Sequence, residues 1–181
     1  MKTNLASVWA ILSVAAAPWI TNADSGQRNQ ASAEFARLKT LVGTWKGKAD
    51  IGQGPVDMTV QYRLLAGGTV LEERVFEGTP MEMVTMFYDK DGKLALTHYC
   101  AMGNRPGMVL KSADAKTLRF DFDKNCGIDT VRESHMHALA ITFDDADRIT
   151  TTCQAIIDGK EMDKHPATLK RVKSEVVAAS R

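Results

Sequence analysis

The sequence predicts an all-β fold: a closed barrel of about ten antiparallel strands in up-and-down order, with a short N-terminal helix capping one end. Apolar and polar residues alternate in segments of strand length, most clearly over 58–64 and 118–122. Turn-forming residues (glycine, proline, asparagine and aspartate) separate neighbouring segments. A helical spacing of apolar residues occurs once, ahead of the first strand, so the chain is expected to run as a series of hairpins.

The expected helix spans 33–41, where Phe35, Leu38 and Leu41 recur at helical spacing and Gly43 follows as a stop. One face of the best-alternating strands consists of Asp, Thr, Gln and Arg. An outer-membrane barrel, whose outer face is apolar, is therefore not expected. The strands are expected to begin at Trp45 and then to cover 58–64, 69–77, 81–88, 93–100, 108–111, 116–123, 134–143, 148–157 and 160–172.

The first residues have the order of a secretory signal peptide: Lys2, an almost entirely apolar run over 5–20, and small residues at spacings that fit cleavage at Ala17 or Ala23. An uncleaved anchor is the alternative, but the run is short for a membrane span and contains a proline. We therefore expect a periplasmic or secreted protein without membrane insertion after cleavage. The expected organisation is a signal peptide at 1–23, a flexible N-terminus at 24–33, the barrel domain at 34–173 and a C-terminal tail at 174–181.

The charge balance argues against some partners. The chain has 23 Lys and Arg against 22 Asp and Glu, and removing 1–23 takes away one lysine and no acid, which leaves 22 against 22. A balanced surface without a basic run does not fit nucleic acid or an anionic membrane as a partner. The cysteines Cys100, Cys126 and Cys153 allow one disulfide and one spare thiol, and their spacing fits no zinc-ribbon or redox pattern.

The segment 38–47, LKTLVGTWKG, resembles the start of calycin-type barrels, in which a short helix precedes a Gly-x-Trp motif at the first strand. Lipocalins share this motif, and Gly-Thr-Trp-x-Gly is more similar to the ten-stranded nitrobindin group. Segments 83–86, 96–100 and 135–137 resemble a bacterial, often exported, family of unassigned function. The resemblance implies a calycin-like barrel. Nitrobindins bind haem through a histidine close to the last strand, where His165 is the one candidate here, without a motif match that transfers the role.

Strand parity places the unusual residues at one end of the barrel. In an up-and-down barrel the odd strands end, and the even strands begin, at the rim opposite the helix. That rim collects the long loops 101–107 and 124–133, three of the four histidines and most of the methionines. The residues predicted to bind a ligand there are Glu73, Met83, His98, Tyr99, Cys100, Asn104, Arg105, His135 and His137.

Several of these side chains are expected inside the barrel. His135 and His137 share their parity with Leu139, so both are expected to face the interior, as is His98. The three histidines would suit a zinc ion, or one of them haem iron; neutral histidines bonded at a wet rim are the alternative. Glu73 lies on an apolar strand face, so it is expected to point inward, where a buried carboxylate needs a partner. Its alternative is to turn outward at a bulge.

Arg105 would clamp a carboxylate or phosphate of a ligand, or else pair with an acid such as Asp129. The methionines near the rim suit a varied apolar ligand as well as ordinary core packing. We therefore expect an exported barrel that binds a small apolar or amphipathic molecule through its open end. A metal- or haem-dependent enzyme using His98, His135 and His137 is the alternative. A third is a filled barrel whose rim loops act on another protein.

Overall fold

The computed structural model of the protein describes residues 31–50 and 54–173. The predicted signal peptide, residues 24–30 of the predicted N-terminus and the predicted tail lie outside the described residues. The elements are α1 (Ala33–Leu38), η1 (Lys39–Leu41), β1 (Gly43–Asp50), β2 (Pro55–Leu65), η2 (Ala66–Gly68), β3 (Val70–Val75), β4 (Met83–Lys90), β5 (Lys93–Tyr99), β6 (Gly107–Ala113), β7 (Thr117–Phe122), β8 (His135–Asp145), β9 (Arg148–Ile157), β10 (Lys160–Glu161) and β11 (His165–Arg171). Within the described ranges, no helix has the length and apolar character needed to cross a membrane.

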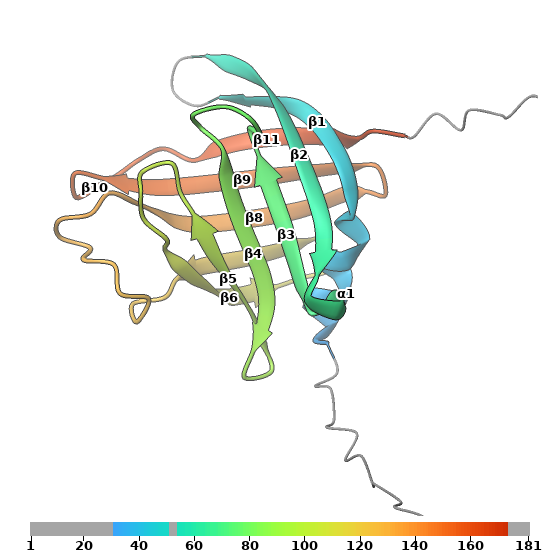
Figure 1. The fold of residues 1–181 in the computed structure, drawn as a ribbon, viewed down its shortest axis with the longest axis horizontal. Coiled ribbons are helices and arrows are strands. Elements are labelled where there is room, and N and C mark those ends of the chain that lie inside the picture. Colours follow the sequence, from blue (N-terminus) through green and yellow to red (C-terminus); the bar gives the residue numbers. More distant parts are fainter. Residues whose placement is uncertain (1–30, 51–53, 174–181) are drawn as a thin grey trace, which may run out of the picture. The chain divides into compact units, whose positions relative to one another are not determined.

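The strands close into an antiparallel barrel (Figure 1). Each of β1 to β8 pairs with the next strand along the chain, and β11 closes the ring between β9 and β1. The short β10 pairs with the same edge of β9 as β11, with Glu161 opposite Ile156 and His165 opposite Cys153. Because the pairing shifts by one residue between them, β10 and β11 are one strand interrupted by a bulge. The predicted ten-stranded up-and-down barrel is confirmed.

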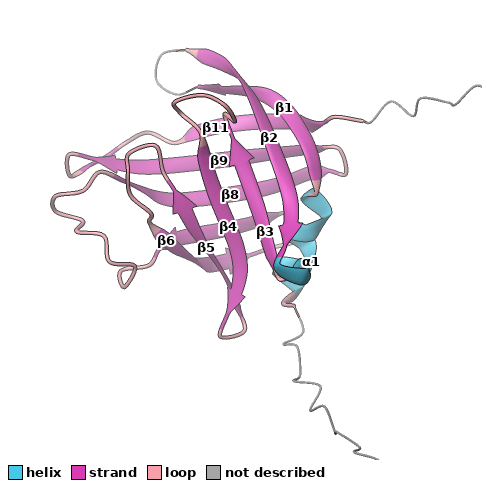
Figure 2. Ribbon diagram, in the orientation of Figure 1, coloured by secondary structure: helices cyan, strands magenta, loops and turns pink. Residues whose placement is uncertain are grey.

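The helix caps the end of the barrel at which β1 begins. Ser32 caps α1 and donates hydrogen bonds to Asp89 at the end of β4, and Arg37 Nη1 donates to the Asp114 carbonyl in the β6–β7 turn at 2.7 Å. Phe35 and Leu38 are fully buried under the barrel. The predicted helix over 33–41 is confirmed, except that its last three residues tighten into the 3₁₀ turn η1. Figure 2 shows α1 in cyan at this end.

The Gly-Thr-Trp-Lys-Gly motif fastens the helix to the first and last strands. Gly43 has a φ of +126°, which a residue with a side chain rarely adopts. The buried Trp45 donates from Nε1 to the Leu41 carbonyl at 2.7 Å, and the Arg171 guanidinium lies 4.2 Å from its ring centre. At Gly47 a Cβ would lie 2.0 Å from the carbonyl oxygen of a residue in β11. The motif is therefore explained by how the barrel starts and closes.

The two ends of the interior differ in packing. Near the helix the interior is filled by large buried side chains, including Trp45, Phe87 and Phe120. Toward the opposite end, Met58, Met83 and Cys153 pack against this core but are only partly buried. The end opposite the helix, where these side chains are only partly buried, is called the open end below.

Candidate functional site

Four polar side chains, one from each of four adjacent strands, form a row along the inner wall of the barrel. Tyr62 of β2 lies opposite Glu73 of β3, Glu73 opposite Thr85 of β4, and Thr85 opposite His98 of β5. Directly opposed residues of antiparallel strands point to the same face of a sheet. Their relative exposures are 1%, 8%, 2% and 6%, so this face is the interior. These four residues are called the polar row below.

Two hydrogen bonds join the residues of the polar row in pairs. The Tyr62 hydroxyl donates to Glu73 Oε1 at 2.6 Å, and Thr85 Oγ1 lies 2.9 Å from His98 Nδ1. Glu73 therefore points inward, as its apolar strand face predicts, and its hydrogen-bond partner is the Tyr62 hydroxyl.

Apolar residues flank the polar row on both sides. On the helix side, Leu71, Phe87 and Leu96 occupy the next inward-facing positions of β3, β4 and β5 and are fully buried. On the open side lie Val75 and Met83, which are paired with each other. The row thus crosses a hydrophobic core, where electrostatic interactions are stronger than in water.

Burial shifts the pKa values of the groups in and around the row. Desolvation raises the pKa of Glu73, although the hydrogen bond from Tyr62 opposes this. It also raises the pKa of Tyr62 well above its ordinary value, and the nearby Glu73 adds to that shift. Desolvation lowers the pKa of His98 to about 4. His98 is therefore neutral at neutral pH, and Tyr62 keeps its proton.

Cys153 of β9 belongs to the same electrostatic environment. Burial, followed by the charges of Glu73 and Cys100, raises the pKa of the Cys153 thiol to about 12. The thiol is thus protonated at neutral pH and unsuited to nucleophilic chemistry. None of the pKa shifts of Tyr62, Glu73, His98 and Cys153 has a lysine or arginine of the described ranges among its causes.

The ring of His98 has one nitrogen in the row and one free. Nδ1 is bonded to Thr85, whereas Nε2 has no hydrogen-bond partner among residues 31–50 and 54–173. His98 Nε2 is therefore the ring nitrogen that no described residue engages.

A bulge interrupts β8 within the histidine pair. It lies between Met136 and Ala138, shifts the pairing with β9 by one residue and breaks the strand alternation there. Met136 consequently belongs to the core, whereas His137 lines an outer hollow of about 540 Å³ together with Arg119 and Asp121. The expectation that both rings face the interior depends on the alternation that this bulge interrupts: His137 borders the outer hollow, and His135 is completely buried.

His135 has no ring nitrogen to offer to a ligand. Its Nδ1 lies 2.8 Å from the Glu133 carbonyl, its Nε2 lies 3.2 Å from His137 Nδ1, and its ring is 4.7 Å from that of Phe122. It is also completely buried. In the described part of the chain, no three His, Cys, Asp or Glu side chains are grouped so that they could hold a metal ion. The zinc site predicted from His98, His135 and His137 is therefore not assembled.

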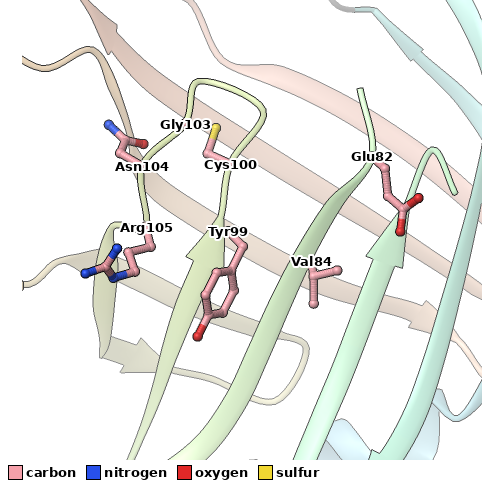
Figure 3. Close-up of a pocket in the computed structure, with 7 residues that line it drawn as sticks. All are labelled: Glu82, Val84, Tyr99, Cys100, Gly103, Asn104 and Arg105. Carbon is pink, nitrogen blue, oxygen red and sulfur yellow. The ribbon is translucent and has the colours of Figure 1, made fainter. Parts of the chain in front are cut away.

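Tyr99, one of the rim residues of the predicted site, lies on the outer face. Tyr99 is paired with Val84, is 49% exposed, and lines an open hollow of about 430 Å³. Figure 3 shows this hollow, with Cys100, Asn104 and Arg105 on its loop side. The predicted ligand-binding residues are therefore divided between the interior, with Glu73, Met83 and His98, and the outer rim.

Two of the rim side chains have polar groups without a partner among the described residues. Asn104 donates from Nδ2 to the Ser134 carbonyl at 2.8 Å, but its buried Oδ1 has no partner within the described ranges. Arg105 forms no ion pair with any described residue, and Asp129 instead faces Arg132 at 3.6 Å. The predicted alternative of an Arg105–Asp129 pair is not formed.

His165, the residue at which the nitrobindin resemblance would place a haem ligand, is half-buried at the start of β11. It lies opposite Cys153 and shares its strand face with the buried Ala167 and Leu169. His165 therefore lies on the inner face of the barrel wall. The strands β1 to β4 separate its strand, β11, from β5, which carries His98.

Sequence reasoning missed Tyr62 and Thr85, the hydrogen-bond partners of Glu73 and His98. For Thr85 a signal exists, because Asp91-Gly92 is a two-residue turn whose φ angles are both positive, at 53° and 75°. A turn of this kind fixes the hairpin register and hence sets Thr85 opposite His98. Tyr62 has no comparable signal, since the longer η2 connection does not define the register of β2 and β3.

Comparisons with known proteins bear on the fold. Neither the family models nor the curated proteins give a match to this sequence. The crystal structure of Rv2717c from M. tuberculosis is similar, with a TM-score of 0.53 and 15% identity over 80% of this chain and 100% of that chain. A protein of unknown function from the DUF3598 family of Nostoc punctiforme has a TM-score of 0.42 and 16% identity over 75% of this chain and 48% of that one. At 15% identity, the likeness to Rv2717c shows a common fold alone.

Proposed function

We propose that the barrel binds a small, largely apolar or amphipathic molecule at the open end of its interior and orients the polar group of that molecule at His98 Nε2. The observation that carries the proposal is the polar row inside an otherwise apolar core. Binding pockets are typically apolar surfaces with a few convergent polar groups, and the open end of this barrel has that composition.

The polar row is costly to the fold. Burying a carboxyl group, a phenol and an imidazole without a counter-charge reduces stability relative to apolar residues of similar size. Groups with perturbed pKa values that face an accessible interior are typical of functional sites. A row that ends in a ring nitrogen without a partner among the described residues is better explained by recognition of a molecule than by packing.

Small side chains on the inner wall at the open end support the proposal. β1 and β11 contribute the inward-facing residues Gly47, Ala49 and Ala167 there, beside His165 at the start of β11. Flexible Met58 and Met83 lie on the other strands of this end. Methionine adapts its shape to varied apolar ligands. A neutral, amphipathic molecule suits this wall. No lysine or arginine of the described ranges contributes to the pKa shifts of the polar row, so no cation there would balance an acidic group on the bound molecule.

Filling the open end is expected to abolish binding. In Met83→Trp the indole would occupy the space above the polar row, and the affinity for the neutral dye N-phenyl-1-naphthylamine should fall by at least about tenfold, or about 1.4 kcal/mol. Val84→Trp is the matched control, because the same side chain is added one residue along on the outer face. It should change the affinity by less than about twofold. Dye fluorescence titrations measure both, and urea unfolding verifies that each variant is folded.

Binding of the dye at the outer hollow lined by Tyr99 and Val84 would contradict the proposal. If Tyr99→Ala or Val84→Trp removes dye binding while Met83→Trp does not, the molecule binds at the rim and not in the interior. In that case the proposed function is incorrect.

We also propose that the protein is an exported, calycin-like barrel whose signal peptide, residues 1–23, is removed. The order of charge, apolar run and small residues supports export, and the Gly-x-Trp motif with its preceding helix supports the calycin-like assignment. Expressed as the full chain in a Gram-negative host, the protein should be recovered from the periplasm with Asp24 as its first residue.

Native mass spectrometry of that periplasmic protein, purified without chelator, tests export and cofactor content together. The expected mass is that of the mature chain plus the mass of one bound small organic molecule. A full-length chain in the membrane fraction would contradict export. Stoichiometric zinc or haem, retained from the host or taken up on incubation, would favour the metal- or haem-dependent enzyme instead.

A further inference from the structure

We propose that a trough on the outer face of the barrel is a second binding site, separate from the interior, which takes a small planar carboxylate and pairs it with Arg105. The trough has a volume of about 340 Å³, lies over β5 between β4 and β6, and adjoins the hollow of Figure 3. The lining residues on which the proposal depends are Tyr88, Ala95, Thr97, Tyr99, Arg105 and Gly107, called the outer trough below.

Arg105 is the arginine that the described part of the chain leaves unpaired. Every other arginine of residues 31–50 and 54–173 forms an ion pair with a carboxylate or donates to a backbone carbonyl group. Arg105 has neither kind of partner in these ranges, and Glu82, the acid of the adjoining hollow, is paired with Arg74 instead. A guanidinium presents a fixed fork of N–H donors that fits a carboxylate with two parallel hydrogen bonds. The free fork of Arg105 is therefore suited to an anionic group from outside the chain.

The backbone holds Arg105 in a fixed position beside Tyr99. The pairing of β5 with β6 continues as far as Cys100, whose amide donates to the Asn104 carbonyl at 3.0 Å. Arg105 therefore lies opposite Tyr99, and directly opposed residues of antiparallel strands point to the same side of a sheet. Val84 lies opposite Tyr99 on the other neighbouring strand, and Figure 3 shows the Tyr99 ring between the side chains of Val84 and Arg105. The guanidinium is thus placed by a strand pairing and not by a loose loop.

Small residues leave the space beside Arg105 unfilled. Before Tyr99, the outward-facing residues of β5 are Thr97 and Ala95, and Gly107, which lies opposite Thr97, has no side chain. The Tyr99 ring is 49% exposed and borders this space. Successive residues on one face of a strand lie about 7 Å apart, so a carboxylate on Arg105 places an attached ring over Gly107 and against the Tyr99 ring.

Two hydroxyl groups form part of the wall of the outer trough, with Tyr88 Oη 3.0 Å from Thr97 Oγ1. One of them donates to the other, so the pair still offers both a donor and an acceptor. Among the charged lining residues, Lys90 forms no ion pair with a described residue, whereas Asp123 accepts from the Asn125 amide at 2.9 Å. With Lys90 the lining has two cations against one carboxylate, which attracts an anion. The hydroxyl pair suits a ligand that also carries a hydroxyl group.

The test is the binding of 4-hydroxybenzoate to the purified protein at neutral pH, followed by ¹H–¹⁵N NMR. Saturable shifts are expected at the backbone amides of Thr97, Tyr99 and Gly107. Two related probes separate the parts of the site. 4-Hydroxybenzyl alcohol, which lacks the negative charge, and acetate, which lacks the ring, should each bind at least about tenfold more weakly.

Two arginine variants test the ion pair. Arg105→Gln removes the charge and the fork, so the affinity for 4-hydroxybenzoate should fall at least about tenfold. Arg148→Gln is the matched control, because it removes the same charge from an exposed arginine at the β8–β9 turn, and it should change the affinity by less than about twofold. Since Arg105 bonds no described residue, the urea midpoint of Arg105→Gln should equal that of the wild-type protein.

A wild-type protein without saturable shifts in the outer trough at about 10 mM 4-hydroxybenzoate overturns the proposal, as does an unchanged affinity in Arg105→Gln. Acetate that binds as tightly as the aromatic acid overturns it too, because the trough would then contribute nothing. The result is separate from the dye experiment, since Met83→Trp fills the interior and should bind 4-hydroxybenzoate as the wild-type protein does. Loss of the acid in Met83→Trp would place it inside the barrel and refute a second site.

Discussion

Lowering the pH from 6.5 to 4 is expected to remove about 3 kcal/mol from the free energy of unfolding through His98 alone. Burial lowers the pKa of His98 from 6.5 to about 4 in the folded protein. Between these values the unfolded chain binds a proton that the folded protein does not, so the stability falls as the pH falls. Above pH 6.5 both states are neutral, and the contribution of His98 is fully present.

Urea unfolding at a series of pH values measures this effect. The loss of stability between pH 6.5 and 4 should be smaller by about 3 kcal/mol in His98→Gln, whose amide is neutral throughout. His165→Gln, which changes a half-buried histidine outside the polar row, should retain the wild-type loss. An unchanged acid loss in His98→Gln would show that the ring accepts a proton in the folded state.

The titration of Glu73 changes the free energy of unfolding in the opposite direction with pH. The experiment must therefore separate its effect from that of His98. Burial raises its pKa above the ordinary 4.5, so its contribution is fully present below pH 4.5 and is lost as the pH rises through the folded value. The two residues therefore offset each other in part between pH 4.5 and 6.5. Repeating the His98→Gln measurement in a Glu73→Gln background isolates the histidine, since the effects of neighbouring buried polar residues are not additive.

The barrel and the inward Glu73 were predictable because they depend on local patterns. Alternation over 58–64 and turns such as Asp91-Gly92 define strands and hairpins, and an apolar strand face identifies a carboxylate that points inward. These signals require no knowledge of which residues are opposed across the sheet. The same holds for the helix, whose apolar spacing and following glycine are visible in nine residues.

The composition of the site was not predictable to the same degree, because it depends on register. Tyr62 and Thr85 are ordinary strand residues, and only their places opposite Glu73 bring them into the row. The bulge at Met136–Ala138 adds one residue to β8, and no glycine or proline in the sequence signals it. The extra residue changes the strand face on which His137 lies. A single extra residue thereby moved a predicted ligand from the interior to the outer face.

Replacing Gly47 by alanine is expected to destabilise the barrel by about 3 kcal/mol. A Cβ at this position would lie 2.0 Å from the Thr168 carbonyl oxygen and 3.0 Å from Leu169 Cδ2. The first of these atoms belongs to the backbone of β11, which pairs with β1 from Trp45 to Ala49 and closes the barrel. The clash can be relieved only by moving that ladder, so the cost falls on barrel closure.

Urea unfolding of Gly47→Ala measures this cost, with Lys46→Ala as the matched control on the outer face of the same strand. The control should stay within about 0.5 kcal/mol of the wild-type protein. A Gly47→Ala protein of unchanged stability would mean that β1 and β11 approach less closely than the structure has them. If the loss is observed, the second glycine of Gly-Thr-Trp-Lys-Gly is required for closure of the ring.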